Sequence, residues 1–248
     1  MFSPKGWARS EATRSGRWAR ATRVGTRGIV TCVVALATYA GTAGAASAST
    51  RAELAKAKKA LLVLSDMPKA WTASASSGNE PTPNPAQLAR CLGVPLSVIN
   101  DNPPAVSSRT FNSKQDLQTV EDQIQVFPTA KAAQADLAVA ANRKAPKCFT
   151  TAFNSPASRS QLESSFGSNA ALGTLVVTRT PVSDYGPHTV NITIYFPVTT
   201  NGVAINIEIA EVGFVKGNEE QLLTLTSVQS PFPVSLSRHL TALADERF

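Results

Sequence analysis

Few residues in this chain could carry hydrolytic chemistry. The sequence has only two histidines, His188 and His239, so a Ser-His-Asp arrangement would have to use one of them. His188 follows Asp184 and Tyr185 at the start of an expected strand, and His239 falls in the expected last helix. The sequence contains no G-x-S-x-G, S-x-x-K or H-E-x-x-H motif and no phosphate-binding glycine loop. It therefore predicts no catalytic residue.

One pair of carboxylates has a spacing that invites comparison with glycoside hydrolases, whose mechanism depends on the distance between two acids. The pair is Glu208 and Glu211. Both fall in an expected strand, where an odd spacing directs them to opposite faces unless a bulge intervenes. We therefore expect both side chains to be solvated. An envelope hydrolase stays as an alternative to a binding function.

A binding function has support from aromatic side chains, because small-molecule pockets are mostly apolar with a few polar groups. The candidate ligand-binding residues are Trp71, Tyr185, His188 and Tyr195. Tyr195 shares one face of an expected strand with Thr193, so it either lines a cleft or packs under a helix. Ordinary core packing is the competing interpretation for every aromatic residue of the set.

The first 48 residues have the composition of a secretory signal. Seven basic residues and one acidic residue precede Gly28, and an apolar run follows from Ile29 to Ala40. Small residues come next, and two small-x-small cleavage sites end at Ala45 and Ala48. We expect a cleaved signal peptide over residues 1–48. The alternative is an uncleaved signal anchor, since the uncharged run is about long enough to span a bilayer.

Removing this segment changes the charge of the protein. The whole chain has 24 basic and 17 acidic residues and a formal net charge of +7. Without the signal, 17 basic and 16 acidic residues remain, so the domain over residues 49–248 is almost neutral. Such a domain has no basic footprint for nucleic acid. Its length suits a single domain, and we expect it to be secreted or held in the cell envelope.

Two cysteines, Cys91 and Cys148, remain in this domain. An even pair in an oxidising compartment predicts a disulfide. Two free thiols or a metal site are the alternatives. No C-x-x-C motif is present and both histidines lie far from either cysteine in sequence, so we expect no metal and no cofactor.

Periodicity places helices and strands along the domain. A capping-box spacing from Thr50 to Glu53 opens an expected helix over residues 50–64. Further helices are expected at 86–92, at 129–143 with Ala132, Ala135 and Val139 on one face, and near the C-terminus. Strands are expected at 107–111, 119–127, 175–178, 190–198, 203–209 and 219–228. The Leu-Leu pair in 219–228 would also suit a helix. We expect the bridge to pin the end of the 129–143 helix to the 86–92 helix.

The hairpin in the last third is the strongest signal. Two alternating apolar runs flank Asn201-Gly202, which supplies the positive φ angles of a tight turn. Beyond Ile209 the apolar phase slips to Val212 and Phe214, which indicates either a bulge or a change of the covered face. The layout is α+β: an antiparallel sheet of about five or six strands packed with helices, with one disulfide.

The order of these features resembles a known family. Asp-x-Pro-x-x-Trp at 66–71, Cys-Leu-Gly at 91–93, Val-Phe-Pro-Thr at 126–129 and Pro-Phe-Pro at 231–233 look like small exported actinobacterial proteins similar to the extracellular sensor domain of PknH-type receptor kinases. The resemblance implies helices packed on an antiparallel sheet and a cleft for an unidentified ligand. The kinase sensor has two disulfides, whereas this chain can form one. Because no kinase domain is present, sensing would need a partner.

The best-supported function is an exported, non-catalytic domain that binds an envelope ligand or a protein partner, without nucleic acid. Membrane contact is expected only if the signal segment stays uncleaved. The alternatives are the envelope hydrolase and a structural or antigen-like secreted protein without a ligand.

The disulfide makes a testable prediction. Closing a loop of this length stabilises a fold by about 4 kcal/mol in the chain-entropy model. We therefore expect Cys91→Ser to lower the free energy of unfolding, measured with urea under non-reducing conditions, by up to about that amount. A variant as stable as the parent would contradict the bridge.

Overall fold

The computed structural model describes residues 48–76, 83–113, 117–167, 169–180 and 189–248. The predicted signal segment, apart from Ala48, lies outside the described residues. Among the described helices, none is long and apolar enough to cross a membrane. The described strands are β1 Trp71–Ser74, β2 Ala105–Ser107, β3 Thr110–Ser113, β4 Gln118–Val126, β5 Ala170–Leu172, β6 Val176–Thr180, β7 Thr189–Thr200, β8 Val203–Lys216 and β9 Glu219–Val228.

These nine strands form one antiparallel sheet in the order β1-β3-β4-β9-β8-β7-β5, with β2 paired to β4 and β6 paired to β7. The predicted class is confirmed, but the expected number of five or six strands was too low. The expected strand at 107–111 is divided between β2 and β3, and the short strands β1 and β5 were not predicted. Strands of three or four residues leave too little alternation to be recognised.

The long hairpin is confirmed. Asn201 and Gly202 have φ of 51° and 75°, as a type I′ turn requires at both central positions. Pairing between β7 and β8 runs without interruption from Thr200↔Val203 to Thr189↔Phe214. No bulge therefore explains the phase slip after Ile209. Both faces of β8 are covered there, and residues 211–215 are all buried.

Seven α-helices are present in the described part of the chain. They are α2 Ala48–Ala60, α3 Pro85–Leu92, α4 Leu96–Ile99, α5 Ala130–Ala141, α6 Ala145–Phe153, α7 Pro156–Phe166 and α8 Val234–Arg247. The first helix ends four residues earlier than expected, and a 3-10 turn, η2 (Leu64–Asp66), follows it. Helices α4, α6 and α7 were not predicted.

Local signals explain where the short helices begin. Asn84 accepts a hydrogen bond from the Gln87 backbone N–H at 3.1 Å ahead of Pro85, the first residue of α3. Ser155 caps α7 in the same way before Pro156, and Thr129 caps α5. Side-chain capping and proline at the first position both favour a helix start.

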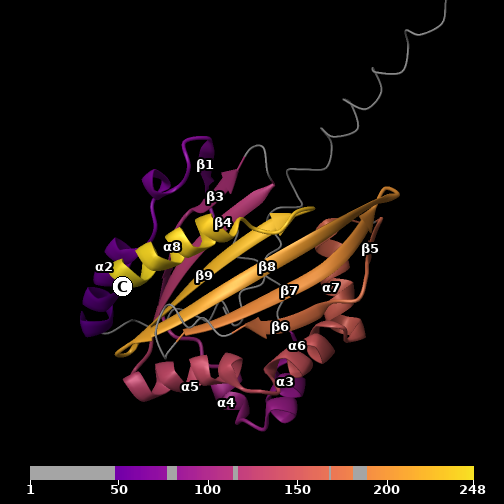
Figure 1. The fold of residues 1–248 in the computed structure, drawn as a ribbon. Helices are drawn as coiled ribbons and strands as arrows, with labels where there is room; N and C mark the ends of the chain where they lie inside the picture. The colour runs from indigo at the N-terminus through magenta and orange to yellow at the C-terminus, as the bar shows by residue number, and fades with distance from the viewer. Residues whose placement is uncertain (1–47, 77–82, 114–116, 168, 181–188) are drawn as a thin grey trace, which may run out of the picture.

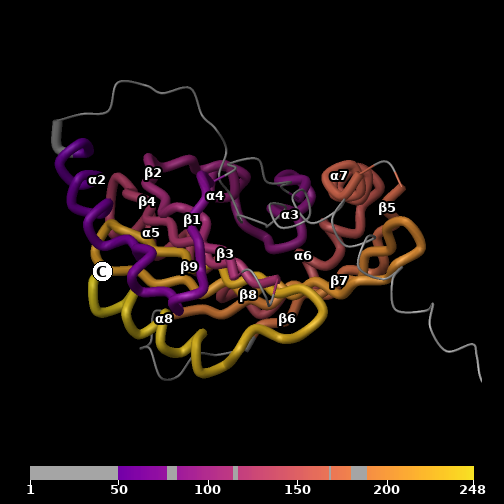
Figure 2. Tube along the Cα trace, turned by 90° about the horizontal axis from the view of Figure 1, so that it is seen from above, coloured from indigo at the N-terminus to yellow at the C-terminus, as the bar shows by residue number. Residues whose placement is uncertain are grey.

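The molecule has three layers (Figures 1 and 2). Helices α3 to α7 cover one face of the sheet, and α8 crosses the other face over β9 and β4. Helix α2 lies along the β2–β4 edge beside α8 (Figure 1). The side chains of the helix-rich layer meet β7 and β8 in one apolar cluster, and α8 meets β9 and β3 in a second cluster.

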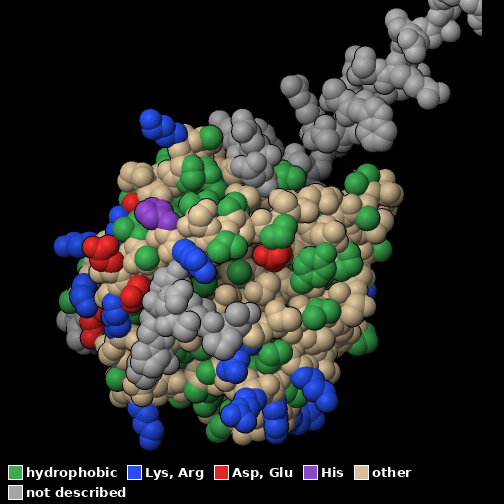
Figure 3. Space-filling model, viewed as in Figure 1, with side chains coloured by type: hydrophobic (Ala, Val, Ile, Leu, Met, Phe, Trp, Pro, Cys, Tyr) green, Lys and Arg blue, Asp and Glu red, His purple; other side chains and the backbone are tan. Residues whose placement is uncertain are grey.

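The α8 face is only partly covered by helices. Figure 3 shows that its charged side chains gather toward the edges, and that few lie over the middle of β7 and β8. Tyr195 on β7 is 43% exposed there. Its register partner is Glu208 on β8.

The disulfide is present and joins Cys91 in α3 to Cys148 in α6, with the Cα atoms 5.6 Å apart. The prediction of a Cys91–Cys148 bridge is therefore confirmed. Its expected anchor was wrong, because Cys148 belongs to a separate helix that begins after α5 has ended. The chain turns at Asn142, whose side chain accepts from the Lys144 backbone N–H.

A buried carboxylate joins the segment just after α2 to the sheet. Asp122 on β4 is fully buried and accepts hydrogen bonds from the Leu62 backbone N–H at 2.8 Å and from Gln221 Nε2 at 2.9 Å. Burial raises the pKa of Asp122 to about 6, against the lowering effect of these two hydrogen bonds. Close by, Arg247 binds Asp66 through two hydrogen bonds of 2.6 and 2.7 Å, which joins η2 to α8.

Asp122 supplies a stability prediction. Asp122→Ala removes the acceptor of two buried donors and should lower the free energy of unfolding by roughly 3 kcal/mol. Asp122→Asn should cost less than about 1 kcal/mol: it can still accept from Leu62, and the Gln221 Oε1 atom, which has no partner, can accept from the new amide once Gln221 turns over.

Urea unfolding at pH 7 measures both variants against the parent. Equal losses of unfolding free energy in the two variants would show that the hydrogen bonds of Asp122 do not hold the segment after α2 to β4.

Candidate functional site

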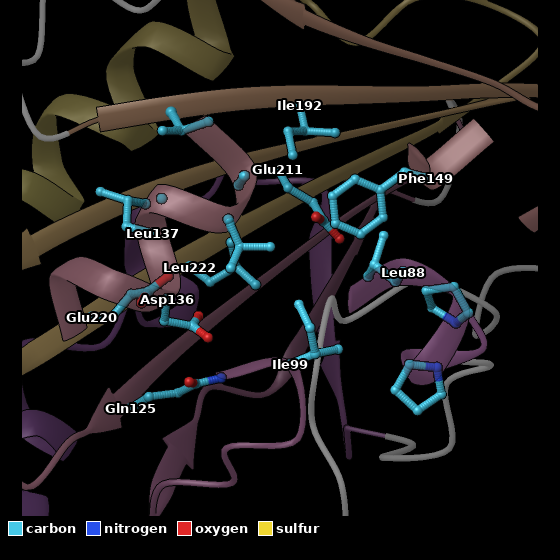
Figure 4. Close-up of a pocket in the computed structure, with 16 residues that line it drawn as sticks. Leu88, Ile99, Gln125, Asp136, Leu137, Phe149, Ile192, Glu211, Glu220 and Leu222 are labelled. Atoms are coloured by element: carbon cyan, nitrogen blue, oxygen red, sulfur yellow. The ribbon is translucent and has the colours of Figure 1, made fainter. Parts of the chain in front are cut away.

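A pocket lies between the helix-rich layer and the sheet. The space between the two layers amounts to about 860 Å³, which includes open solvent at its mouth. Its apolar walls come from α3, α4, α5, α6, β7 and β9, and their lining residues are Pro85, Leu88, Ile99, Leu137, Val139, Ala140, Phe149, Val190, Ile192 and Leu222, with Pro83 just before α3. Four polar side chains share the lining: Gln125, Asp136, Glu211 and Glu220 (Figure 4).

The floor of the pocket depends on a glycine. Gly213 on β8 lies directly under α5, and a Cβ atom added there would stand 2.8 Å from Leu137 Cδ1. No real Cβ makes such a contact without displacing its neighbour. Gly213 therefore allows α5 to approach the sheet while leaving room beside it.

Strand register brings the acids to one face. Glu211 pairs with Thr224, and Val215 pairs with Glu220, so both glutamates lie on the side of the sheet that faces α5. Asp136 comes down from α5 to meet Glu220. Figure 4 shows Asp136 and Glu220 on the α5 side of the pocket and Glu211 on the side of Phe149.

Asp136 and Glu220 share a proton. Their carboxyl groups are hydrogen-bonded to each other, which is possible only if one of them is protonated. Burial, the nearby charge of Asp136 and the hydrogen bond that Glu220 donates together hold the pKa of Glu220 well above its usual range. Burial also raises the pKa of Asp136 to about 6, with Asp101 adding to the rise and the hydrogen bond from Glu220 opposing it.

One oxygen of this pair has no partner. Glu220 is 7% exposed, and its Oε2 atom makes no hydrogen bond within the described protein. A buried carboxyl oxygen without a donor costs free energy. This oxygen is thus a free hydrogen-bond acceptor that a donor on a molecule in the pocket would satisfy.

Glu211 corrects an expectation. Glu208 and Glu211 do point to opposite faces, as predicted, and Glu208 lies on the incompletely covered face. Glu211, however, is 2% exposed and lines the pocket. It was expected to be solvated because alternation on one strand cannot show that helices cover both faces of β8 at this point.

The structure separates the ligand-binding residues predicted from the sequence. Trp71 is 7% exposed and packs in the cluster under α8, on the other side of the sheet from the pocket. Tyr195 is exposed on that same side. Tyr185 and His188 fall outside the described residues. Neither Trp71 nor Tyr195 lines the pocket, and a role in binding stays a prediction for all four residues.

None of the described pocket residues was predicted to bind a ligand, and four of them come from α5. The expected face of Ala132, Ala135 and Val139 is not the buried one, since Ala133 and Leu137 are buried and Ala135 is exposed. Asp136, the only acid in α5, could have been noticed as a charge next to the buried Leu137.

The remaining chemistry of the described residues is limited. They contain no group of three or more His, Cys, Asp or Glu side chains arranged to hold a metal ion. His239 is exposed on α8 and takes part in none of the hydrogen bonds found among the described residues. What the pocket can do is accept protons and hydrogen-bond donors from a bound molecule.

Comparison with known proteins gives a similarity of structure. A search of solved structures finds the extracellular domain of PknH from Mycobacterium tuberculosis, with a TM-score of 0.33 and 9% sequence identity, covering 66% of this chain and 91% of that chain. No protein-family model matches the sequence, and a search of the curated proteins finds no match.

The shared proton predicts how stability depends on pH. Because the pKa values of Asp136 and Glu220 are raised in the folded state, their contribution to stability is complete below the unfolded values near pH 4 and is lost as pH rises through the folded values. Asp136→Asn keeps an acceptor for Glu220 and removes a charge. We expect the loss of unfolding free energy between pH 5 and pH 8 to shrink by roughly 2 kcal/mol in this variant.

Urea unfolding at the two pH values measures the effect. Glu246→Gln, at an exposed position on α8, is the control for removing a carboxylate. An unchanged pH dependence in Asp136→Asn would contradict the shared proton.

Proposed function

We propose that this chain is an exported, non-catalytic domain that binds a small molecule with a mainly apolar body in the pocket between α3–α6 and the β7–β9 face of the sheet. The observation that carries the proposal is the pocket itself. Protein interiors are normally packed to the density of organic crystals. Here Gly213 and Ala140 leave space where larger side chains would close the layer, and buried carboxyl groups point into that space.

The composition of the pocket supports binding of an apolar molecule. Ligand sites are typically concave and apolar, with a small number of polar groups that set orientation. The described lining has eleven apolar residues, and two of its three acids, Asp136 and Glu220, lie together on the α5 side of the pocket. An apolar body with one polar end fits this division.

Two features support an extracytoplasmic location. The composition of residues 1–48 is that of a secretory signal, and the Cys91–Cys148 bond is of the kind that persists in oxidising compartments. Leu88 and Phe149 line the pocket and lie close in sequence to Cys91 and Cys148. The disulfide therefore holds two walls of the pocket in place when it is formed.

The alternatives have less support. Glycoside hydrolases hold their two carboxyl groups roughly 5 to 9.5 Å apart, so that a sugar bond or a water fits between them. Asp136 and Glu220 hydrogen-bond each other directly, which leaves no such gap. A purely structural secreted protein has no need of a pocket containing destabilising buried acids.

The proposal predicts that filling the pocket abolishes binding. Ala140 on α5 lines the pocket, and Ala138 on the same helix is exposed. Ala140→Trp should weaken binding of the neutral apolar dye N-phenyl-1-naphthylamine by at least about tenfold, since an indole ring occupies the space, whereas Ala138→Trp should leave it unchanged.

Fluorescence titration of the oxidised domain from residue 46 onward measures the dye, and native mass spectrometry of the same preparations identifies any molecule that co-purifies. Equal dye binding by the two tryptophan variants, with no co-purified molecule lost from Ala140→Trp, would overturn the proposal.

A further inference from the structure

We infer that the ligand of this pocket carries a basic, protonated nitrogen, an amine or a guanidine, which binds the Asp136–Glu220 pair while the apolar body lies against Leu137, Phe149 and Ile192. The inference rests on the proposed function and names its ligand class. Geometry and charge carry it in three steps.

The first step is the charge of the lining. Among the 16 described residues that line the pocket, three are acids and none is Lys, Arg or His. Asp101, just beyond α4, lies close enough to Asp136 to add a like charge. Arg179 binds the Ala141 carbonyl oxygen at the end of α5 and thus lies outside the lining. Among the described lining residues, Asp136 and Glu220 therefore have no basic side chain beside them.

The second step is the unused acceptor. Glu220 Oε2 is buried and accepts no hydrogen bond within the described protein. The side-chain partner of the Asp136 carboxyl is the protonated Glu220. A protonated nitrogen has several N–H donors. It can donate to Glu220 Oε2 and to Asp136 at once, and charge-assisted hydrogen bonds of this kind are the stronger ones.

The third step is the exchange of protons. A cation beside a buried carboxyl favours its ionised form, so binding replaces the shared proton by the charge of the ligand and releases that proton to solvent. Loss of the proton and gain of the cation leave the net charge of the site unchanged. An anionic head group would instead meet the negative charge of the Asp136–Glu220 pair, and a neutral one would gain no such charge pairing.

Three probes that differ only in the head group test the inference: n-octylamine, 1-octanol and octanoate. Displacement of N-phenyl-1-naphthylamine from the oxidised domain at pH 8 gives each affinity. We expect octylamine to bind at least about tenfold tighter than octanol, and octanoate more weakly than both. Between pH 8 and pH 5 the affinity of octylamine should fall roughly tenfold as protons compete, whereas that of octanol should stay constant.

Variants assign the effect to the pair. Asp136→Asn should reduce octylamine to the affinity of octanol and leave octanol unchanged. Glu220→Gln gives a second test should Asp136→Asn not fold, with the same expected result. Glu246→Gln, exposed on α8, is the matched control and should change neither affinity.

The outcomes separate the ligand class from the binding function. Octanol or octanoate binding as tightly as octylamine, with all binding lost in Ala140→Trp, would overturn the basic ligand and keep the pocket as a binding site. An octylamine affinity that Asp136→Asn and Glu220→Gln do not alter would likewise overturn it. Failure of all three probes to displace the dye, with Ala140→Trp binding dye like the parent, would overturn the proposed function as well.

Discussion

The bond between Cys91 and Cys148 holds together the layer on which the pocket depends. Helices α3 and α6 have 8 and 9 residues, which is too short for either to be stable in water by itself. The bond links them across 57 residues of sequence. Leu88 lies one turn before Cys91, and Phe149 directly follows Cys148, so the same link that stabilises the fold also holds two walls of the pocket in place.

The sheet carries a buried carboxyl group on each side, and the two sites satisfy it differently. On the α8 side, Asp122 receives two protein donors and ties the chain after α2 to β4. On the α5 side, Asp136 and Glu220 satisfy each other only by sharing a proton, and one oxygen stays without a donor. The first arrangement is complete in itself and belongs to folding. The second leaves one acceptor unused among the described residues, and the proposed binding rests on that acceptor.

Sequence reasoning could reach the α+β class, the disulfide pair, the long hairpin and the approximate position of α5, because each has a local signal: alternation, a cysteine count, Asn-Gly, and alanine propensity. It could not reach β1, β5, α6 or α7, whose length or composition gives no clear period. The site was out of reach for a different reason. Glu211 is buried under helices that lie far from it in the sequence, and Asp136 meets Glu220 only because α5 crosses β9. The residues next to Glu211 and Asp136 in the sequence therefore do not indicate either environment.

The two ends of the described chain lie on the same side of the molecule. Phe248 packs beside Ala57 of α2 and Leu61 just after it, and Figures 1 and 2 place both α2 and the C-terminus at the opposite end of the molecule from α7 and β5. A tether before α2 and a carrier attached after Phe248 would thus hold the domain by one end. In either case the end that carries α7 and β5 would face away from the anchoring surface, and both kinds of attachment would present the domain in the same orientation.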